Sequence, residues 1–173
     1  MPVSLVMTVI GDDRPGLVES VSHAVANHDG NWLDSRMSRL AGKFAGILRV
    51  EVAEARPAGL EAELNQLASS GLQVIVESGG SSSVGEGEIL LLELIGDDHP
   101  GIVRDISRAL AGRKVNIEEL QTETYDTPMS GGMLFKATAR VGLPAGVSSD
   151  DLRQALEALG DDLMVRISLE QPA

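Results

Sequence analysis

The chain carries the stretch Ile10-Gly11-Asp12-Asp13-Arg14-Pro15-Gly16-Leu17-Val18 and repeats it 85 residues later as Ile95-Gly96-Asp97-Asp98-His99-Pro100-Gly101-Ile102-Val103. Ten of the seventeen residue pairs that begin with this stretch are identical. Similarity at a fixed spacing indicates a duplicated domain. In both halves the stretch lies between an apolar run and a helical pattern, so it predicts the turn from a strand into a helix. Residues 11–16 and 96–101 are called the motif turns below.

The repeat also predicts the domain organisation. A length of 173 residues accommodates two small domains, and the repeat assigns about half of the chain to each. Between the halves the composition changes to glycine and serine, which is typical of a flexible linker. We therefore expect an N-terminal domain over residues 1–78, a linker over 79–87 and a C-terminal domain over 88–173.

Hydrophobic periodicity predicts the order strand, helix, strand, strand, helix, strand in each half. The strands are expected at 4–10, 31–40, 44–52, 73–77, 88–95, 116–125, 133–141 and 163–169, and the helices at 15–28, 57–70, 100–113 and 149–159. Pro15 is expected at the first helical position, and Ser149 or Asp150 as the cap of the last helix. Right-handed crossovers then give two α+β, ferredoxin-like βαββαβ domains, each an antiparallel four-stranded sheet with two helices on one face.

Composition and charge exclude several classes of function. The net charge of −12 repels a phosphate backbone, and no cluster of Lys and Arg with interleaved aromatic residues is present, so direct nucleic-acid binding is not expected. There is no cysteine, which removes disulfides and thiolate metal sites. No apolar run is long enough for a membrane span and no secretory leader pattern opens the chain. We expect a cytoplasmic protein, in which any role in gene control runs through a protein partner.

The residue types that carry chemistry in many enzymes have no catalytic arrangement in this sequence. His23, His28 and His99 share no repeated metal-ligand spacing. The chain has no nucleophile elbow, no Walker-type phosphate loop and no zinc-protease motif, so neither catalysis nor a metal or cofactor is expected. The pairs Asp12-Asp13 and Asp97-Asp98 precede helices, where three roles are open: helix capping, contact with a ligand, and acid/base catalysis.

A helix start offers a binding site for a small anion. The first backbone N–H groups of a helix lack partners and the positive end of the dipole points outward, so a carboxylate can bind there. Gly16 and Gly101 have no Cβ, which lets a small ligand approach the main chain but equally lets the turn take backbone angles that other residues avoid. A purely structural role of the glycine and proline residues is therefore the alternative.

Asn31 and Asn116 favour the binding interpretation. They are related by the same 85-residue spacing, and each opens the next strand, which we expect to start at or near the rim that holds the motif turn. An asparagine offers both a donor and an acceptor, and a zwitterionic amino acid needs both. The candidate ligand-binding residues are Asp12, Asp13, Arg14, Pro15, Gly16, Asn31, Asp97, Asp98, His99, Pro100, Gly101 and Asn116.

These features resemble a known family. The tandem βαββαβ order, with Asp-x-Pro-Gly-(Leu/Ile)-Val after the first strand and Asn-(Trp/Ile) opening the second, is similar to a pair of ACT domains, which are regulatory modules that bind amino acids. A stand-alone pair of this length resembles the glycine cleavage system transcriptional repressor family. The resemblance implies side-by-side pairing of the sheets, small-molecule sites near the motif turns at the domain interface, and regulation through another protein. We expect a homo-oligomer, a small amino acid such as glycine as the ligand, and a transcription regulator as the protein partner. Arg14 against His99 is a difference between the copies, so the two sites need not bind equally.

Two further features are open to more than one interpretation. Trp32, the only tryptophan, is expected either at an interface between domains or chains or in the core. The segment 126–132 replaces a two-residue hairpin turn and is either a loop that contacts a partner or a tolerated insertion. The leading hypothesis is a non-enzymatic amino-acid sensor, and the alternatives are a ligand-independent scaffold and an enzyme of amino-acid metabolism.

Overall fold

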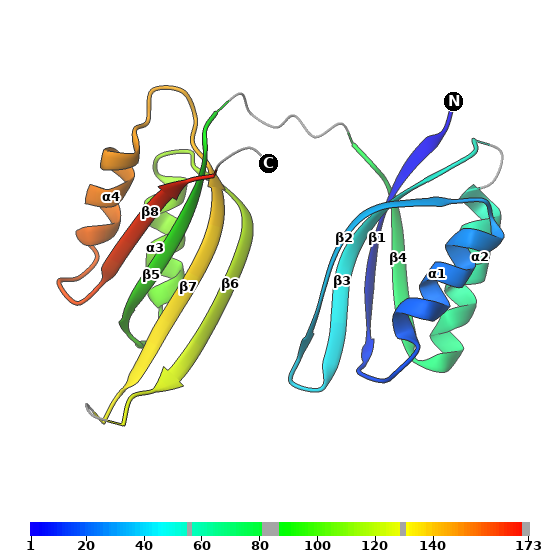
Figure 1. Cartoon of the computed structure of the whole chain (residues 1–173), viewed down its shortest axis with the longest axis horizontal. Coiled ribbons are helices and arrows are strands. Elements are labelled where there is room, and N and C mark those ends of the chain that lie inside the picture. Colours follow the sequence, from blue (N-terminus) through cyan, green and yellow to red (C-terminus); the bar gives the residue numbers. More distant parts are fainter. Residues whose placement is uncertain (55–56, 81–86, 129–130, 171–173) are drawn as a thin grey trace. The chain divides into compact units, whose positions relative to one another are not determined.

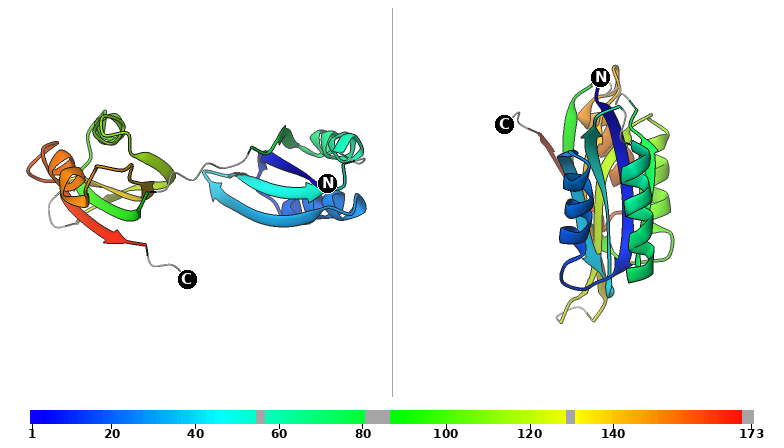
Figure 2. Two further views of the ribbon diagram at one scale, coloured as in Figure 1. Left: turned by 90° about the horizontal axis from the view of Figure 1, so that it is seen from above. Right: turned by 90° about the vertical axis from the view of Figure 1, so that its right-hand side faces the viewer.

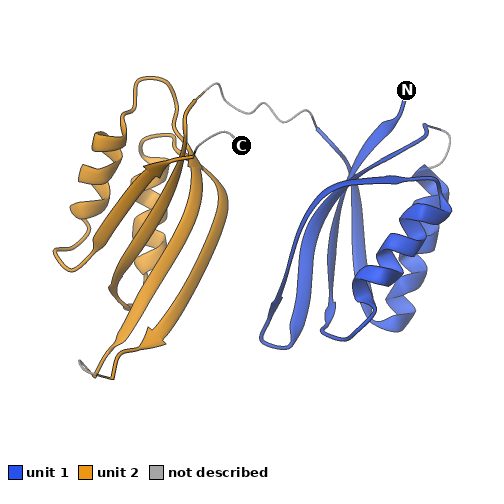
Figure 3. Ribbon diagram, in the orientation of Figure 1, with its two compact units in different colours: residues 1–82 blue, residues 83–173 orange. Residues whose placement is uncertain are grey.

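The computed structural model describes residues 1–54, 57–80, 87–128 and 131–170. The chain divides into two compact units, Met1–Ser82 (unit 1) and Ser83–Ala173 (unit 2), which Figure 3 distinguishes by colour. Residues 81–86 of the expected linker lie outside the described part of the chain.

Unit 1 is a four-stranded antiparallel sheet with two helices on one face (Figure 1). The strand order is β2-β3-β1-β4, so β2 and β4 are edge strands. Along the chain the elements are β1 (Val3–Asp12), α1 (Leu17–Asn27), β2 (Asn31–Leu40), β3 (Lys43–Val52), α2 (Pro57–Gln66), a short 3-10 helix η1 (Leu67–Ser70) and β4 (Leu72–Ser78).

Unit 2 repeats this architecture, and Figure 2 shows the sheet and helix layers of both units from two further directions. Its strand order is β6-β7-β5-β8. The elements are β5 (Ile89–Asp97), α3 (Ile102–Ala111), β6 (Asn116–Asp126), β7 (Met133–Gly142), α4 (Ser149–Glu157) and β8 (Met164–Leu169). The predicted α+β fold of two ferredoxin-like domains is confirmed.

Each unit has its own apolar core between the sheet and the helix layer. In unit 1 the side chains of Met7, Leu60 and Leu64 are fully buried, and in unit 2 those of Leu152 and Leu156 are. No polar or charged residue is buried in the described part of the chain. The alternation of apolar and polar residues in the strands therefore places one face of each sheet on the helices and leaves the other face open.

The starts of three helices differ from the prediction. Helix α1 begins at Leu17, because Gly16 before it has a φ of 92°, which no helical residue adopts, and Pro15 therefore lies outside the helix. Unit 2 has the same arrangement around Gly101, with a φ of 87°. The last helix, α4, is capped by Ser148 in a capping box and not by either of the two residues expected.

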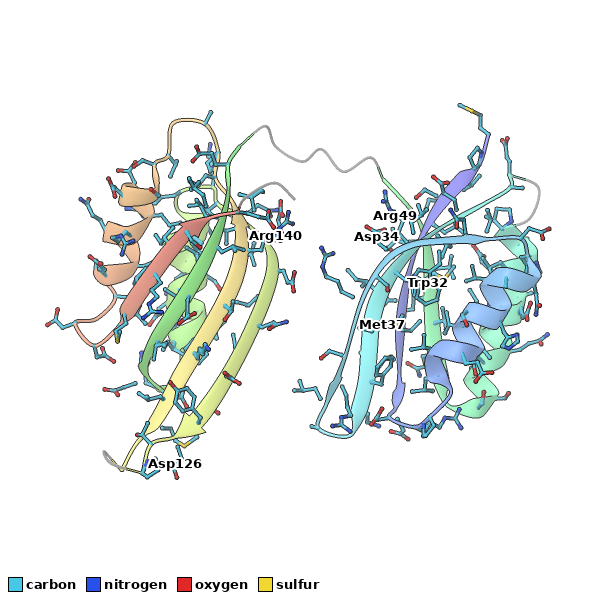
Figure 4. All side chains as sticks on the ribbon, viewed as in Figure 1. Trp32, Asp34, Met37, Arg49, Asp126 and Arg140 are labelled. Atoms are coloured by element: carbon cyan, nitrogen blue, oxygen red, sulfur yellow. The ribbon has the colours of Figure 1, made fainter. Side chains whose placement is uncertain are left out.

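Both second strands contain a bulge near their start, which the sequence pattern did not reveal. The register of β2 against β3 shifts between Trp32 and Asp34, and that of β6 against β7 shifts at the equivalent place. The extra residue reverses the alternation, so Trp32 and Met37 both pack against the core of unit 1, where Figure 4 labels them. Core packing is therefore the interpretation of Trp32 that the structure supports.

The loop between β6 and β7 is longer than the Ala41-Gly42 turn between β2 and β3. At its base the Thr127 N–H and hydroxyl both donate to the Gly132 carbonyl, at 3.1 and 2.9 Å. Residues 129 and 130 lie outside the described part of the chain, so the proposed partner role of this loop stays a prediction.

We expect Leu156→Ala to lower the free energy of unfolding by about 2 to 5 kcal/mol, because it removes a fully buried side chain and leaves a cavity. Urea denaturation followed by circular dichroism measures the change. Leu159→Ala is the matched control, since this side chain is 40% exposed and its loss should cost about 1 kcal/mol or less. Equal losses in the two variants would contradict the assignment of the core.

Candidate functional site

The acidic pair of the first motif turn is held by cations of the β2–β3 hairpin. Asp12 forms an ion pair with Lys43, and Asp13 lies 3.5 Å from Arg39. The hydrogen bond and positive charge of Lys43, with a smaller contribution from Arg14, lower the pKa of the Asp12 carboxyl. Neither α1 nor α3 receives a side-chain cap, so the capping interpretation of the acids is wrong.

The second motif turn is fastened differently. The Asp97 N–H donates to the Asp162 carboxylate at 2.9 Å, whereas the bond from the Asp98 N–H to the Met133 carbonyl, at 3.0 Å, repeats the bond from the Asp13 N–H to the Gly42 carbonyl in unit 1. Leu134 faces Asp97 across the sheet, in the place where Lys43 faces Asp12 in unit 1. The second turn therefore lacks the lysine that neutralises the first.

The first glycine of each motif turn permits a close approach of the turn that follows the second helix. A Cβ on Gly11 would lie 2.9 Å from the Gly71 carbonyl oxygen, and one on Gly96 would lie 3.0 Å from the Leu163 side chain. At Gly11 the close atom belongs to the backbone, so only glycine fits there, whereas at Gly96 the Leu163 side chain would have to shift to admit a Cβ. The two turns of each unit consequently lie side by side.

The second glycine of each motif turn controls access to the helix start. The first backbone bonds of the helices run from the Ser20 N–H to the Gly16 carbonyl and from the Asp105 N–H to the Gly101 carbonyl, both at 2.9 Å. The N–H groups of residues 17–19 and 102–104, which precede Ser20 and Asp105 in the chain, have no carbonyl within the helix to bind. No atom lies within 4 Å of a Cβ built on Gly16, whereas the Arg104 guanidinium lies 2.8 Å from one built on Gly101. The first helix start is therefore open and the second is covered by an arginine.

A shallow hollow lies beside each motif turn. The hollow of unit 1 includes Ser70, whose carbonyl accepts a hydrogen bond from the Arg14 guanidinium. Sequence reasoning missed the contribution of the turn after the second helix, because neither Ser70 of unit 1 nor Asp162 of unit 2 belongs to a repeated motif. The lining residues are Arg14, Pro15, Gly16, Glu19, Ser20, His23 and Ser70 in unit 1, and His99, Ile102, Asp105, Ile106, Leu159, Gly160, Asp162 and Leu163 in unit 2.

The two hollows differ in charge more than the Arg14/His99 pair alone suggests. Glu19 of unit 1, which lies 3.6 Å from His23, corresponds to Arg104 of unit 2, whose guanidinium lies 3.2 Å from Asp105. The duplicated backbone therefore carries opposite charges at equivalent positions of α1 and α3, of which Glu19 lines the hollow of unit 1.

Asn31 and Asn116 do not lie near the motif turn of their own unit. Across the sheet, Asn31 of β2 is level with Glu51 of β3 and with Ser4 of β1. Ser4 is seven residues from Gly11, the first residue of the motif turn. This separation corresponds to about 23 Å along the sheet. Asn116 has the equivalent register in unit 2. The expectation that both features share one rim is wrong, because β2 and β1 run in the same direction with antiparallel β3 between them.

A repeated arginine on the open face of each sheet was also missed. Arg49 binds Asp34 at 2.8 Å, and Arg140 binds Glu118 at 2.5 Å and Glu170 at 2.9 Å (Figure 4). Hydrogen bonding and charge from Glu170, with Glu118 contributing, raise the pKa of the Arg140 guanidinium, and the same arginine lowers the pKa of the Glu170 carboxyl. The pairs Arg49–Asp34 and Arg140–Glu118 link neighbouring strands on the open face, whereas Arg140–Glu170 reaches past β5 to the residue that follows β8.

A change in repeat spacing conceals these arginines in the sequence. Beyond the longer loop of unit 2 the spacing between equivalent residues is 91 instead of 85, and it relates Phe44 to Phe135, Arg49 to Arg140 and Val50 to Val141. Aligning the halves with a six-residue insertion in the hairpin would have found them.

No group of three or more His, Cys, Asp or Glu side chains in the described part of the chain is arranged to hold a metal ion. Among the same residues, no helix is both long and apolar enough to cross a membrane.

Comparison with known sequences decides the family. The sequence profile of the ACT domain matches residues 4–77 and, a second time, residues 88–170. The chain belongs to the ACT domain family. Both matches include a motif turn and the strand and helix on either side of it.

Two curated relatives are single-domain-sized proteins. The UPF0237 protein of Methanocaldococcus jannaschii is 36% identical over 76 residues, which cover 42% of this chain and 84% of that protein. The UPF0237 protein of Methanopyrus kandleri is 42% identical over 50 residues, and this match spans 29% of this chain and only 56% of the relative.

Two solved structures match the chain over nearly its whole length. A protein described as unknown from Galdieria sulphuraria has a TM-score of 0.87 and 29% identity, with 99% of this chain and 100% of that chain covered. A proposed glycine cleavage system transcriptional repressor has a TM-score of 0.73 and 18% identity, with 99% of each chain covered. The second likeness shows a shared tandem ACT fold.

We expect Lys43→Met to raise the pKa of the Asp12 carboxyl toward its ordinary value, because the substitution removes the cation that lowers it. The folded-state pKa lies below the unfolded one, so the ion pair stabilises the protein above the unfolded pKa, and this stabilisation is lost as the pH falls through the folded pKa. A carbon-13 NMR titration of Asp12 measures the shift. Lys43→Arg keeps the charge and should leave the pKa low, and an unchanged Asp12 titration in Lys43→Met would contradict the ion pair.

Proposed function

We propose that this ACT protein is a non-enzymatic, cytoplasmic amino-acid sensor that regulates a protein partner. The observation that carries the proposal is the motif turn of each unit, in which a left-handed glycine precedes a helix and a shallow hollow lies beside the turn. The acids of the first turn are paired with Lys43 and Arg39, which suits a role in holding the turn better than one in proton transfer.

The open helix start of unit 1 fits the carboxylate of an amino acid. The N–H groups of Leu17, Val18 and Glu19 can donate to an anion that approaches over Gly16, where the space is empty. The Glu19 carboxylate in the same hollow is an acceptor for the ammonium group. A shallow hollow favours a ligand with a small side chain, and glycine is the simplest candidate.

We propose that each site is completed by a second ACT unit. The edge strands β2 and β6 begin with Asn31 and Asn116, at the end of the sheet opposite the motif turn. Antiparallel pairing of two edge strands reverses one sheet relative to the other, so that the asparagine of one unit reaches the end that holds the motif turn of its neighbour. An assembly of ACT units would therefore bring together the two features that a single unit keeps apart.

Regulation would follow from this shared site. A ligand held between two ACT units favours the arrangement in which both contact it, and such coupling is typically about 1 to 3 kcal/mol. A net charge of −12 opposes direct contact with DNA, so the partner is proposed to be a protein, such as a transcription regulator. The likeness in fold to the proposed glycine cleavage repressor is consistent with this role.

We expect titration with glycine or another small amino acid to produce a saturable signal in calorimetry and in Trp32 emission, since Trp32 is the only tryptophan and follows Asn31 in β2. Gly16→Val and Gly101→Val should reduce the affinity at least about tenfold at the altered turn, because a branched side chain blocks the approach and opposes a positive φ. Gly146→Val is the matched control, since Gly146 has a φ of 86° and follows β7 at the end of unit 2 opposite its motif turn.

Two outcomes would overturn the sensor. The absence of a response to any of the twenty amino acids at millimolar concentration would favour a ligand-independent scaffold, and unchanged affinity in folded glycine variants would place the site elsewhere. Turnover of an amino acid by the purified protein would instead indicate an enzyme.

Completion of the site by a second unit makes a separate prediction. Asn116→Ala should weaken ligand binding although Asn116 lies about 23 Å from the motif turn of its own unit. Isothermal calorimetry measures the affinity, and Thr124→Ala on the same strand is the control, expected to leave it unchanged. Equal affinities in wild type and Asn116→Ala would show that the motif turns bind without help from the second strand.

A further inference from the structure

The helix layer of unit 2 has an uneven distribution of charge. On α3 the residues Ile102, Ile106 and Leu110 are buried, and the opposite side of the helix carries Arg104 and Arg108, which are exposed. Exposed Arg113 and Lys114 follow directly after the helix. The four cations form a basic ridge along one element of a protein whose net charge is −12.

The neighbouring helix presents the opposite charge. On α4, Leu152 and Leu156 are buried, and the solvent side carries Asp150 and Glu157. Exposed Asp161 lies a few residues beyond the end of the helix. These three carboxylates form an acidic ridge beside the basic ridge, because α3 and α4 contact each other on the same face of the sheet (Figure 1).

The two helices run in opposite directions. The start of α3 and the end of α4 line the same hollow, through Ile102 and Leu159. At the other end the Asp151 carboxyl, whose pKa is lowered mainly by the capping contacts of Ser148, also feels the charge of Arg113 beyond the end of α3. Arg104 is therefore level with Glu157, and Arg113 is level with Asp150.

Most of these charges are not used within unit 2. In the described part of the chain, neither Arg108 nor Asp150 has a hydrogen-bonding or ion-pair partner on its side chain. Two ridge charges have partners on their own helix: Arg104 lies 3.2 Å from Asp105, and the exposed Glu157 lies 3.9 Å from Arg153. Unit 1 has no corresponding ridge, because α1 and α2 contain no lysine or arginine. The ridges are therefore a property of unit 2 and not of the shared fold.

We propose that the helix layer of unit 2 binds the same layer of a second copy of this chain, with the basic ridge of each copy against the acidic ridge of the other. A two-fold axis parallel to the helices produces this contact, since it places α3 of one copy over α4 of its partner and keeps equivalent ends level. Both ridges are then matched, with Arg104 against Glu157 of the partner subunit and Arg113 against Asp150 of the partner subunit.

Other occupants match only half of the surface. A nucleic acid would be attracted by the basic ridge and repelled by the acidic ridge, which lies one helix spacing of about 10 Å away. The helices of unit 1 contain no lysine or arginine, so binding to them would leave the carboxylates of α4 without an opposite charge. A copy of the α3–α4 layer places opposite charges against both ridges.

The association should be weak and sensitive to salt. Helix α3 has ten residues and is about 15 Å long, so the contact is small and its charges remain close to solvent.

The variant R104E/R108E should weaken dimerisation roughly tenfold or more in sedimentation equilibrium, because it brings like charges together. D150K/E157K should do the same, whereas the control E54K/E61K changes the net charge equally on unit 1 and should not.

Variants in which opposite charges face each other again give the decisive comparison with the double variants. The quadruple variant R104E/R108E/D150K/E157K keeps the wild-type net charge and exchanges the two ridges, so it should dimerise again. An equimolar mixture of the two double variants should form heterodimers. A monomeric wild type at low salt, double variants that dimerise normally, or a quadruple variant as weak as the doubles would each overturn the proposal.

Cross-linking tests the arrangement of the helices directly, since the chain has no cysteine of its own. Ser107→Cys lies on α3 and Gln154→Cys lies level with it on α4. A mixture of the two single variants should give a covalent dimer under mild oxidation, whereas neither variant alone should. Cross-linking of Ser107→Cys with itself, or none in the mixture, would exclude the proposed two-fold axis. Circular dichroism confirms that each variant is folded.

Discussion

Both units depend on a backbone conformation that only glycine adopts without strain. Gly16 and Gly101 have φ values of 92° and 87°, and these angles end the extended chain and begin a helix that covers the sheet. The same conformation starts a helix whose first N–H groups have no carbonyl within the helix to bind, and a hollow lies beside this turn. A second glycine, Gly11 or Gly96, lets the turn after the second helix approach closely enough to form the other side of that hollow. Fold and candidate site therefore have one origin.

Duplication preserved this backbone and changed the charges around it. In unit 1 the acids of the motif turn are paired with Lys43 and Arg39, and the space over Gly16 is open. In unit 2 the Asp97 N–H binds the Asp162 carboxylate, and Arg104 covers Gly101. The helix layers diverged as well, because the cations of α3 have no counterpart on α1. Two units with one fold can thus divide ligand binding and association between them.

Much of the fold could be predicted from the sequence, because periodicity and turn residues act locally. The strands, the helices and their order are where the apolar pattern places them. The errors concern features that local pattern does not contain. Pro15 lies outside its helix because the backbone angle of Gly16 ends the turn, and the bulge after Trp32 reverses the alternation along β2. Neither effect changes the hydrophobic pattern enough to be recognised.

The sequence by itself determined the duplication, the fold of each half and the residues of the two motif turns, since these depend on apolar spacing and on glycine at defined positions. Only the tertiary structure decided which residues meet. Strand direction places Asn31 at the far end of the sheet from the turn that it was expected to join, and helix packing places Ser70 beside Arg14. The physical reason is that contacts between distant segments depend on the direction and register of strands and helices, which no local pattern of residues specifies.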